Sequence, residues 1–306
     1  MLRVPIIQAE PGMRLSLPVH RPLSNDVLLR EGFALDRMTI GRLRELRVPE
    51  VWIDYPGAER IRRFVSPEVY RLQANLVHQT SDLFERVQCD AGAKLDYAAY
   101  RTTMSGLIDQ LLANHHAAVH LSEIAGAGES QARHATTVCL LSLLIGLRLQ
   151  GYLVSERPKL DAVHARDTTN LGIGAMLHDV GLSRLPAECA RCEFDLDGND
   201  PQWRSHVQKG YEMVIGNLDA SAAIVVLDHH QSWDGHGFPE HGHFGAEPAP
   251  RHGHDIHVFA RIVAAADAYD RLLHRVDGGM WPRVRAMNTL LNSPLNGRFD
   301  PVVLAV

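Results

Sequence analysis

The chain has 306 residues, 45% of them hydrophobic, and a formal net charge of −5. This length is enough for one large domain with a buried core and a smaller second one. No surplus of lysine and arginine is available to neutralise phosphates, which argues against a DNA-binding protein. The first residues hold no continuous apolar segment, and the longest apolar run, CLLSLLIGL at 139–147, is too short to cross a bilayer. We therefore expect a cytoplasmic protein without a membrane contact.

Residues 1–64 differ in pattern from the rest of the chain. Short apolar stretches (VPII, VLL and VWI) are separated by prolines and glycines, which predicts short strands joined by turns. The stretch TIGRLRELRV at 39–48 predicts one short helix. No residues in this segment have a catalytic spacing, so we interpret 1–64 as a small β-containing regulatory or accessory module.

From Ser66 onward the apolar residues follow helical spacing. The helix predicted at 66–87 begins with a serine cap, a proline at its first position and Glu68 in its first turn. Further helices are predicted at about 97–121 and 133–150, and near 168–180, 203–217, 220–230, 256–275 and 282–292. The fold class is therefore mainly α, with connecting helices over 65–124 and an all-α domain over 125–306.

Several helices carry metal-binding types of residue at buried positions. His178-Asp179 end an apolar helix that Gly181 terminates, and a buried aspartate is costly unless it is paired or bound to a metal. Taken alone, the dipeptide would be an ordinary histidine beside a helix C-terminus. The anomaly recurs on four more predicted helices, at His134, His206, His229-His230 and Asp267.

Imidazoles and carboxylates without thiolates suit iron, manganese, nickel or cobalt as well as zinc. Two such ions, roughly 3.5–4 Å apart, are the usual device for attacking a phosphate ester, with a bridging hydroxide as the nucleophile. We expect the aspartates to bridge the ions and the imidazoles to fill terminal positions. His229 and His230 are interpreted as ligands, and the glycine-rich loop that follows them as a wall of the same pocket.

These motifs together resemble the HD-GYP family, a branch of the HD phosphohydrolases. The resemblance covers about residue 125 to the end and rests on RHATTV (133–138), LHDVG (177–181), HVQKGYEM (206–213), HHQSWDGHGFP (229–239), ARIVAAADAYD (260–270) and GRFDPVV (297–303). It implies a helical domain with a binuclear, sometimes trinuclear, iron or manganese centre that hydrolyses cyclic di-GMP in bacterial signalling. Residues 1–64 look like the small module often found before this domain.

By position in these motifs, the resemblance implies seven metal ligands: His134, His178, Asp179, His206, His229, His230 and Asp267. His178 and Asp179 are assigned as catalytic, with Asp179 as the bridge between two ions, for which iron or manganese is preferred and zinc, nickel or cobalt are alternatives. Substrate binding is assigned to Asp234, Gly237, Phe238, Pro239, Arg271 and Arg275.

The chain departs from the family pattern at positions that affect substrate binding. Phe238 replaces the tyrosine of Gly-Tyr-Pro, and Leu182 replaces a lysine that would contact a phosphate. The usual Arg-Pro-Tyr after the last motif helix is Val276-Asp277-Gly278 here, so Arg271 and Arg275 are the nearby substitutes. Trinuclear members have a glutamate where this chain has Ser130, which favours a binuclear centre.

The resemblance therefore implies a phosphodiesterase that converts cyclic di-GMP to linear pGpG. The loss of the lysine at Leu182 predicts slow turnover, and a gain in rate on Leu182→Lys. The alternative is that Leu182 packs into the core after the helix ends, in which case a lysine would only destabilise the protein. Two alternatives remain: a protein that keeps the metal but only binds the nucleotide or other signalling proteins, and an HD phosphohydrolase of another nucleotide. The oligomeric state, including a dimer, is left open.

Overall fold

The computed structural model describes residues 1–21, 26–48, 50–57, 67–89, 96–113, 130–190, 200–242, 247–274, 281–292 and 296–306. Its internal contacts divide the chain into two compact units, Met1–Asp82 with Ser105–Thr136, and Leu83–Met104 with Thr137–Val306. Three helices, α2 (Pro67–Cys89), α3 (Tyr97–Ala113) and α5 (Ser130–Arg148), have residues in both units. The predicted boundaries at 64 and 124 fall outside the described residues and stay predictions.

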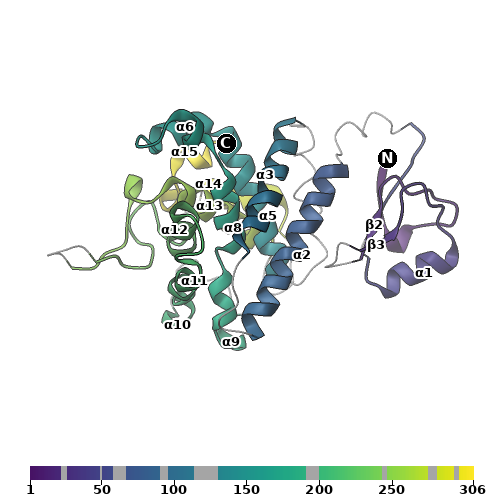
Figure 1. The fold of residues 1–306 in the computed structure, drawn as a ribbon, viewed down its shortest axis with the longest axis horizontal. Coiled ribbons are helices and arrows are strands. Elements are labelled where there is room, and N and C mark those ends of the chain that lie inside the picture. Colours follow the sequence, from purple (N-terminus) through teal and green to yellow (C-terminus); the bar gives the residue numbers. More distant parts are fainter. Residues whose placement is uncertain are drawn as a thin grey trace. The chain divides into compact units, whose positions relative to one another are not determined.

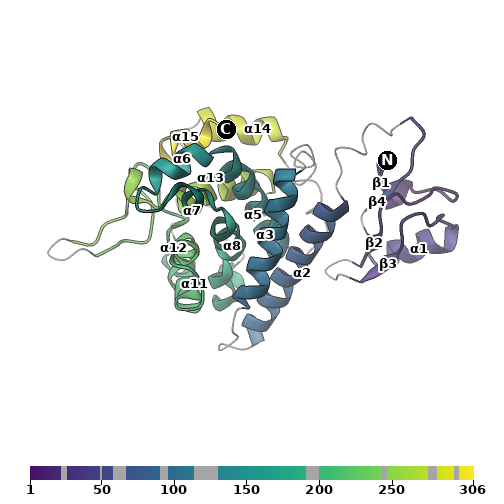
Figure 2. The ribbon, with the colours of Figure 1, turned by 45° about the horizontal axis from the view of Figure 1, so that its top comes forward.

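The N-terminal part of the first unit contains the predicted strands. Strand β1 (Leu2–Pro5) pairs antiparallel with β4 (Glu50–Ile53), and β2 (Val19–His20) pairs antiparallel with β3 (Val27–Leu29). The helix α1 (Arg37–Glu45) begins at Asp36, whose carboxylate accepts a hydrogen bond from the Thr39 amide. These strands and α1 lie side by side in Figure 2. A core that includes Leu15, Leu35 and Leu43 joins them, which confirms a small β-containing module.

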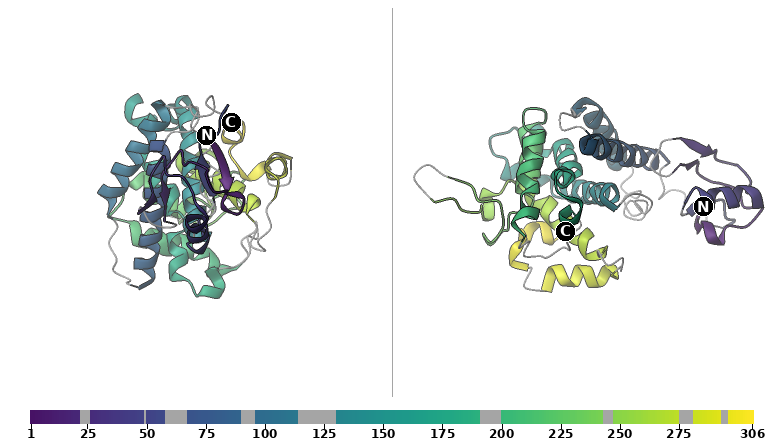
Figure 3. Two further views of the ribbon diagram at one scale, coloured as in Figure 1. Left: turned by 90° about the vertical axis from the view of Figure 1, so that its right-hand side faces the viewer. Right: turned by 90° about the horizontal axis from the view of Figure 1, so that it is seen from below.

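The second unit is helical, as its apolar spacing predicted. Its central helix, α8 (Thr169–Leu177), is buried on nearly every face, and α12 (Ala220–Asp228) packs along it (Figure 1). The helix α11 (His206–Val214) packs on α12, and so does α13 (Val258–Leu273). Both α14 (Arg283–Asn292) and α15 (Pro301–Leu304) contact α13 (Figures 2 and 3).

Shorter helices complete this unit. They are α6 (Gln150–Glu156), α7 (Ala162–Arg166), α9 (Ala187–Ala190) and α10 (Pro201–Arg204), together with the 3-10 turns η4 (Val180–Arg184), η5 (Gly253–Asp255) and η6 (Asn296–Arg298). The mainly α fold class is therefore confirmed. Among the described residues no single helix is long and apolar enough to cross a membrane, and only α5 with α6, bent by 84°, passes that test as a pair.

Candidate metal centre

The end of α8 brings the first two predicted ligands into the core of the second unit. His178 caps α8 and Asp179 precedes η4, and both side chains are almost fully buried. Gly181 lets α11 approach closely, because a Cβ at this position would lie 1.9 Å from the carbonyl oxygen of His206. A glycine is therefore required here for His206 to lie next to Asp179.

Three buried histidines are fixed in one tautomer by the backbone. A carbonyl oxygen only accepts hydrogen bonds, so a ring nitrogen that contacts one must carry the proton. The contacts all involve Nδ1 and are His178 with Ala175 (2.6 Å), His206 with Trp203 (2.7 Å) and His229 with Val226 (3.1 Å). In the neutral ring the Nε2 lone pair is then available as a ligand, which is the usual arrangement of metal-binding histidines.

The first group of ligands, which we call the histidine half, gathers around one oxygen of Asp179. The Oδ1 atom lies 3.3 Å from His206 Nε2 and 3.6 Å from His229 Nε2, and these two nitrogens are 3.4 Å apart. Potential ligand atoms of Asp179, His206, His229 and His230 all lie within 4.8 Å of one another. Among the described residues, nothing forms a hydrogen bond with the buried Nε2 of His230.

The second group, the carboxylate half, consists of His178, Asp267 and the other oxygen of Asp179. His178 Nε2 lies 3.5 Å from Asp179 Oδ2 and 3.6 Å from Asp267 Oδ1. The nearly all-buried helix α13 supplies Asp267 and, one turn later, Arg271. Arg271 donates to both carboxylates, from Nη2 to Asp179 Oδ2 (2.6 Å) and from Nε to Asp267 Oδ1 (2.7 Å).

Burial and charge make the two halves electrostatically different. Burial lowers the pKa of His229 to about 4 and that of His230 well below its usual value, so both are neutral at pH 7. Burial acts the same way on His178, but the charges of Asp179 and Asp267 outweigh it and raise its pKa to about 10. Burial raises the pKa of Asp179, yet His178 and Arg271 hold it well below the ordinary value.

These residues fit a metal site. Two buried carboxylates converge with the Nε2 atoms of several histidines, and they offer only nitrogen and oxygen donors. Because the pKa of His178 is about 10 without a metal, an ion that binds its Nε2 would displace a proton. His134, the seventh predicted ligand, lies in the part of α5 that belongs to the first unit, so its role stays a prediction.

A pocket of about 370 Å³ lies beside the metal ligands. It is lined by residues that include His229, His230, Asp267, Gly237 and Phe238. A glycine is needed at position 237, because a Cβ there would lie 2.3 Å from the Ser232 amide nitrogen. The predicted wall of the pocket, the glycine-rich loop, is therefore present at Gly237 and Phe238.

The ring of Phe238 lies between two other groups. It stacks on the His230 ring with centroids 4.7 Å apart, and the Arg204 guanidinium lies 5.0 Å from its centroid. The pocket is also lined by Arg298, and the sequence analysis missed both arginines. They come from α10 and η6, far from each other in the chain, and no spacing rule would join them.

Other residues assigned to substrate binding lie elsewhere. Asp234 and Pro239 do not line this pocket. The Asp234 carboxylate instead accepts from Ser232 Oγ (2.5 Å), and the Phe238-Pro239 peptide bond is cis. Arg271 contacts the metal-ligand carboxylates, and Arg275 lies outside the described residues.

Leu182 packs in an apolar cluster. It is 7% exposed and contacts Leu185 and Trp203, with Phe238 packed against the same cluster. The leucine therefore has a structural role, which is the alternative to a phosphate contact that the sequence left open.

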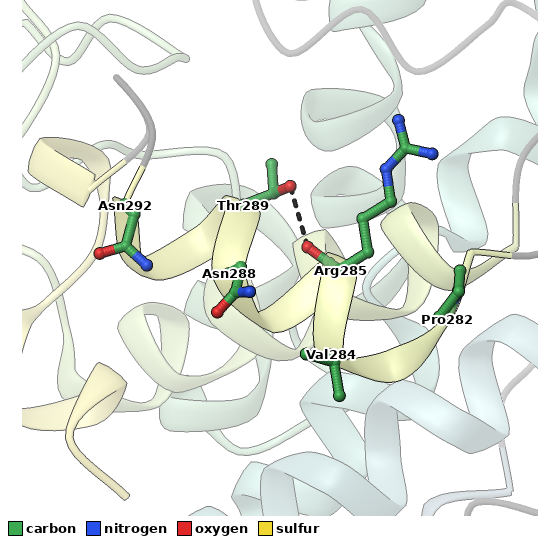
Figure 4. Close-up of a pocket in the computed structure, with 6 residues that line it drawn as sticks. All are labelled: Pro282, Val284, Arg285, Asn288, Thr289 and Asn292. Carbon is green, nitrogen blue, oxygen red and sulfur yellow. Dashed lines mark hydrogen bonds between the residues drawn. The ribbon is translucent and has the colours of Figure 1, made fainter.

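Two further hollows in this unit lack the metal ligands. One, of about 540 Å³, runs along α14, where Thr289 Oγ1 donates to the Arg285 carbonyl (3.0 Å) (Figure 4). The other, of about 1070 Å³, lies among α11, α12 and the residues before α13. Neither is lined by any of the seven predicted metal ligands.

Comparison with known proteins agrees with this geometry. The sequence model of the HD domain family matches residues 148–303, which is more than half of the chain. The chain belongs to the HD domain family. The family resemblance predicted from the motifs is thereby confirmed.

Relatives of this HD domain protein include two named phosphodiesterases. The cyclic di-GMP phosphodiesterase PA4108 of Pseudomonas aeruginosa is 26% identical over 98% of this chain and 74% of its own length. The 3'3'-cGAMP-specific phosphodiesterase 2 of Vibrio cholerae is 31% identical over 31% of this chain and 17% of its own length. A solved structure, Bd1817, an HDG"Y"P protein from Bdellovibrio bacteriovorus, is 16% identical, with a TM-score of 0.56 over 99% of this chain and 97% of that one. At that identity it shows the fold.

Proposed function

We propose that this protein is a metal-dependent phosphodiesterase that hydrolyses cyclic di-GMP. The observation that carries the proposal is the convergence of three Nε2 atoms, each fixed by an Nδ1 contact to a backbone carbonyl, with Asp179 and Asp267. The names of both phosphodiesterase relatives support a cyclic dinucleotide as the substrate. The two names differ in the bases of the substrate: cyclic di-GMP has two guanines, and 3'3'-cGAMP has one guanine and one adenine.

The proposed cofactor is a pair of divalent ions, iron or manganese by preference. Bound ions of this kind supply a nucleophile at neutral pH and neutralise charge on a phosphodiester. The histidine half would hold one ion and the carboxylate half the other, since one oxygen of Asp179 is directed to each half. Asp179 keeps its charge, because His178 and Arg271 hold its pKa well below the ordinary value, and so it attracts cations into the buried centre.

The pocket beside the ligands is the proposed substrate site. Arg204 and Arg298 provide positive charge for the phosphates, since neither the lysine replaced by Leu182 nor the Arg-Pro-Tyr of the family is present. Phe238 lies at the wall of this pocket, where its ring stacks on His230 and the Arg204 guanidinium lies 5.0 Å from its centroid. It therefore supports the positions of His230 and Arg204 in the proposed substrate site.

The proposed product is the linear dinucleotide pGpG. One hydrolysis opens the ring, and a second would require the linear product to bind again. Ser130, where trinuclear relatives have a glutamate, supports a binuclear centre that stops after the first step. A time course in which GMP is the dominant early product would contradict this part of the proposal.

Turnover of defined substrates by metal-loaded protein tests the function. Protein purified without oxygen and loaded with Mn²⁺ or Fe²⁺ should convert cyclic di-GMP to pGpG, and 3'3'-cGAMP assayed in parallel measures base specificity. Tight binding of cyclic di-GMP without turnover would instead identify a nucleotide-binding module. Turnover of the mixed dinucleotide alone would replace the proposed substrate.

A further inference from the structure

Arg271 lies inside the candidate metal centre, among the ligands themselves. Its side chain is 15% exposed, and its Nε and Nη2 groups donate to Asp267 Oδ1 and Asp179 Oδ2. The spacing of four residues from Asp267 places both side chains on the same face of α13. A guanidinium therefore holds one oxygen from each carboxylate that the centre contains.

The two hydrogen bonds of Arg271 to the carboxylates both fall on one half of the centre. Asp179 Oδ2 and Asp267 Oδ1, which both belong to the carboxylate half, accept its two hydrogen bonds. The other oxygen, Asp179 Oδ1, faces the Nε2 atoms of His206 and His229. The two halves thus differ in whether a fixed cation already holds their carboxylate oxygens.

A guanidinium and a metal ion compete for the same oxygen lone pairs. The charge-assisted hydrogen bonds of Arg271 must break before those oxygens can bind a divalent ion. While the guanidinium stays in place, its positive charge also repels the ion. An arginine does not lose its proton in a protein, so a rise in pH does not remove the competitor. The side chain has to move away, and its long flexible stem permits that movement.

We propose that Arg271 is a built-in counter-cation that makes the two metal sites unequal. The first ion binds in the histidine half, and the second binds in the carboxylate half only when Arg271 releases Asp179 and Asp267. When metal is scarce, Arg271 compensates the two buried carboxylates, and the centre stays singly loaded. The inference rests on the proposed metal-dependent function, but its test requires no turnover.

Titration of metal-free protein with Mn²⁺ tests this inference. Calorimetry, together with the electron paramagnetic resonance signal of free Mn²⁺, gives the affinity of each site. The wild-type protein should bind one ion tightly and a second ion more weakly. Arg271→Met keeps the apolar stem and removes the charge and the donors, so it should strengthen the second site by about ten- to a hundredfold. The first site should change by less than about threefold, because the two hydrogen bonds of Arg271 go to Asp179 Oδ2 and Asp267 Oδ1 and not to the oxygen that faces His206 and His229.

Two further variants separate competition from general effects of charge or folding. Arg283→Met removes one positive charge from an exposed position on α14 and should leave both affinities unchanged. Arg271→Lys keeps the charge, but an ammonium group lacks the planar guanidinium that donates to both carboxylates. The affinity of its second metal site should therefore lie between those of the wild type and Arg271→Met. If Arg271→Met is unstable without metal, Mn²⁺ should raise its melting temperature by more than it raises that of the wild type.

Two results would overturn the inference in distinguishable ways. Two ions of equal affinity in the wild type, or a second site that Arg271→Met leaves unchanged or weakens, would remove the competitive role of Arg271 and leave the proposed function standing. No Mn²⁺ binding by any variant would overturn the proposed metal-dependent function and this inference with it.

Discussion

At the scale of single residues, Asp179 contacts both halves of the centre, because its two carboxylate oxygens face different partners. Its Oδ1 faces two imidazoles, while its Oδ2 faces Arg271 and His178. If two ions bind, this carboxylate would offer one oxygen to each of them, which fits the bridging role proposed for Asp179. The sequence placed Asp179 at a buried helix end but gave no means of assigning its two oxygens to different partners.

The first prediction concerns the charge of Asp179. Asp179→Asn keeps the shape of the side chain and removes the charge, so the protein should lose at least one ion per chain. Elemental analysis after anaerobic purification measures this, with Asp255→Asn, at an exposed position, as the matched control. Full metal stoichiometry in Asp179→Asn would show that the bridge is assigned to the wrong residue.

Leu182 gives a second prediction, which reverses the gain in rate expected from the sequence. Because Leu182 is buried against Leu185 and Trp203, a lysine there would place a charge in an apolar cluster. Leu182→Lys should lower the free energy of unfolding by at least about 2 kcal/mol, the loss typical of a truncated core leucine, and should not speed turnover. Thermal melts measure the loss of stability, with Leu160→Lys, a substitution of an exposed leucine, as the control.

A faster Leu182→Lys protein with an unchanged melting temperature would contradict this account. It would show that the side chain reaches the phosphate after all.

The third prediction concerns Arg204 and Arg298, which line the pocket. Replacing either by glutamine should raise the KM for cyclic di-GMP by about tenfold, because one charge-assisted hydrogen bond to a phosphate is lost. The number of bound ions should not change, since neither arginine is a ligand. Arg283→Gln serves as the control for the change in net charge, and an unchanged KM in both pocket variants would exclude a phosphate contact.

At the scale of secondary structure, helical spacing predicted the long elements of the second unit. The helices α8, α11, α12, α13 and α14 lie where apolar residues recur at helical intervals. The short helices α6 and α7 were not predicted, because five to seven residues give too little periodicity to detect. Their ends are fixed instead by tertiary contacts and by caps, such as the Asp161 carboxylate that accepts from the Val163 amide at the start of α7.

The position of Arg271 illustrates a signal that was present in the sequence but not used. Asp267 and Arg271 are four residues apart on a helix, a spacing that favours an ion pair. The absence of Arg-Pro-Tyr directed the sequence analysis to a role in substrate binding. Only the approach of η4 to α13 shows that the same guanidinium also reaches Asp179.

One ionic network joins three helices and leads to a fourth prediction. Arg261 on α13 donates to Asp300, the cap of α15 (2.7 Å), and forms an ion pair with Glu156 of α6. Burial raises the pKa of Glu156, but hydrogen bonds from His254 and Arg261 outweigh it and hold the pKa below its usual 4.5. A pKa that is lower in the folded state contributes stability above about pH 4.5, and this stability is lost as the pH falls through the folded value.

Glu156→Gln should therefore lower the free energy of unfolding at pH 7 by about 1.5–3 kcal/mol, the range for a hydrogen bond to a charged group. The difference from wild type should shrink as the pH falls below about 4.5. Urea denaturation at several pH values measures it, with the exposed Glu212→Gln as the control. A difference that is the same at every pH would mean that the Glu156 charge contributes nothing.

At the scale of the whole molecule, the chain consists of two units of different composition. The change from short apolar stretches with prolines to long helical spacing predicted a β-containing module followed by a helical domain, and the fold confirms both. The proposed metal ligands His178, Asp179, His206, His229, His230 and Asp267 lie in the second unit. The residues that carry charge around the pocket could not be predicted, because tertiary packing brings α10, α13 and η6 together.

The central claim is that hydrolysis of cyclic di-GMP depends on the ions of this centre. The most direct test measures pGpG formation against the number of Mn²⁺ ions bound per chain, from metal-free protein to full loading. We expect no turnover without metal, little with one ion, and full turnover only when the second ion has bound. Turnover that is independent of the bound metal, or no turnover of a fully loaded protein, would contradict the account.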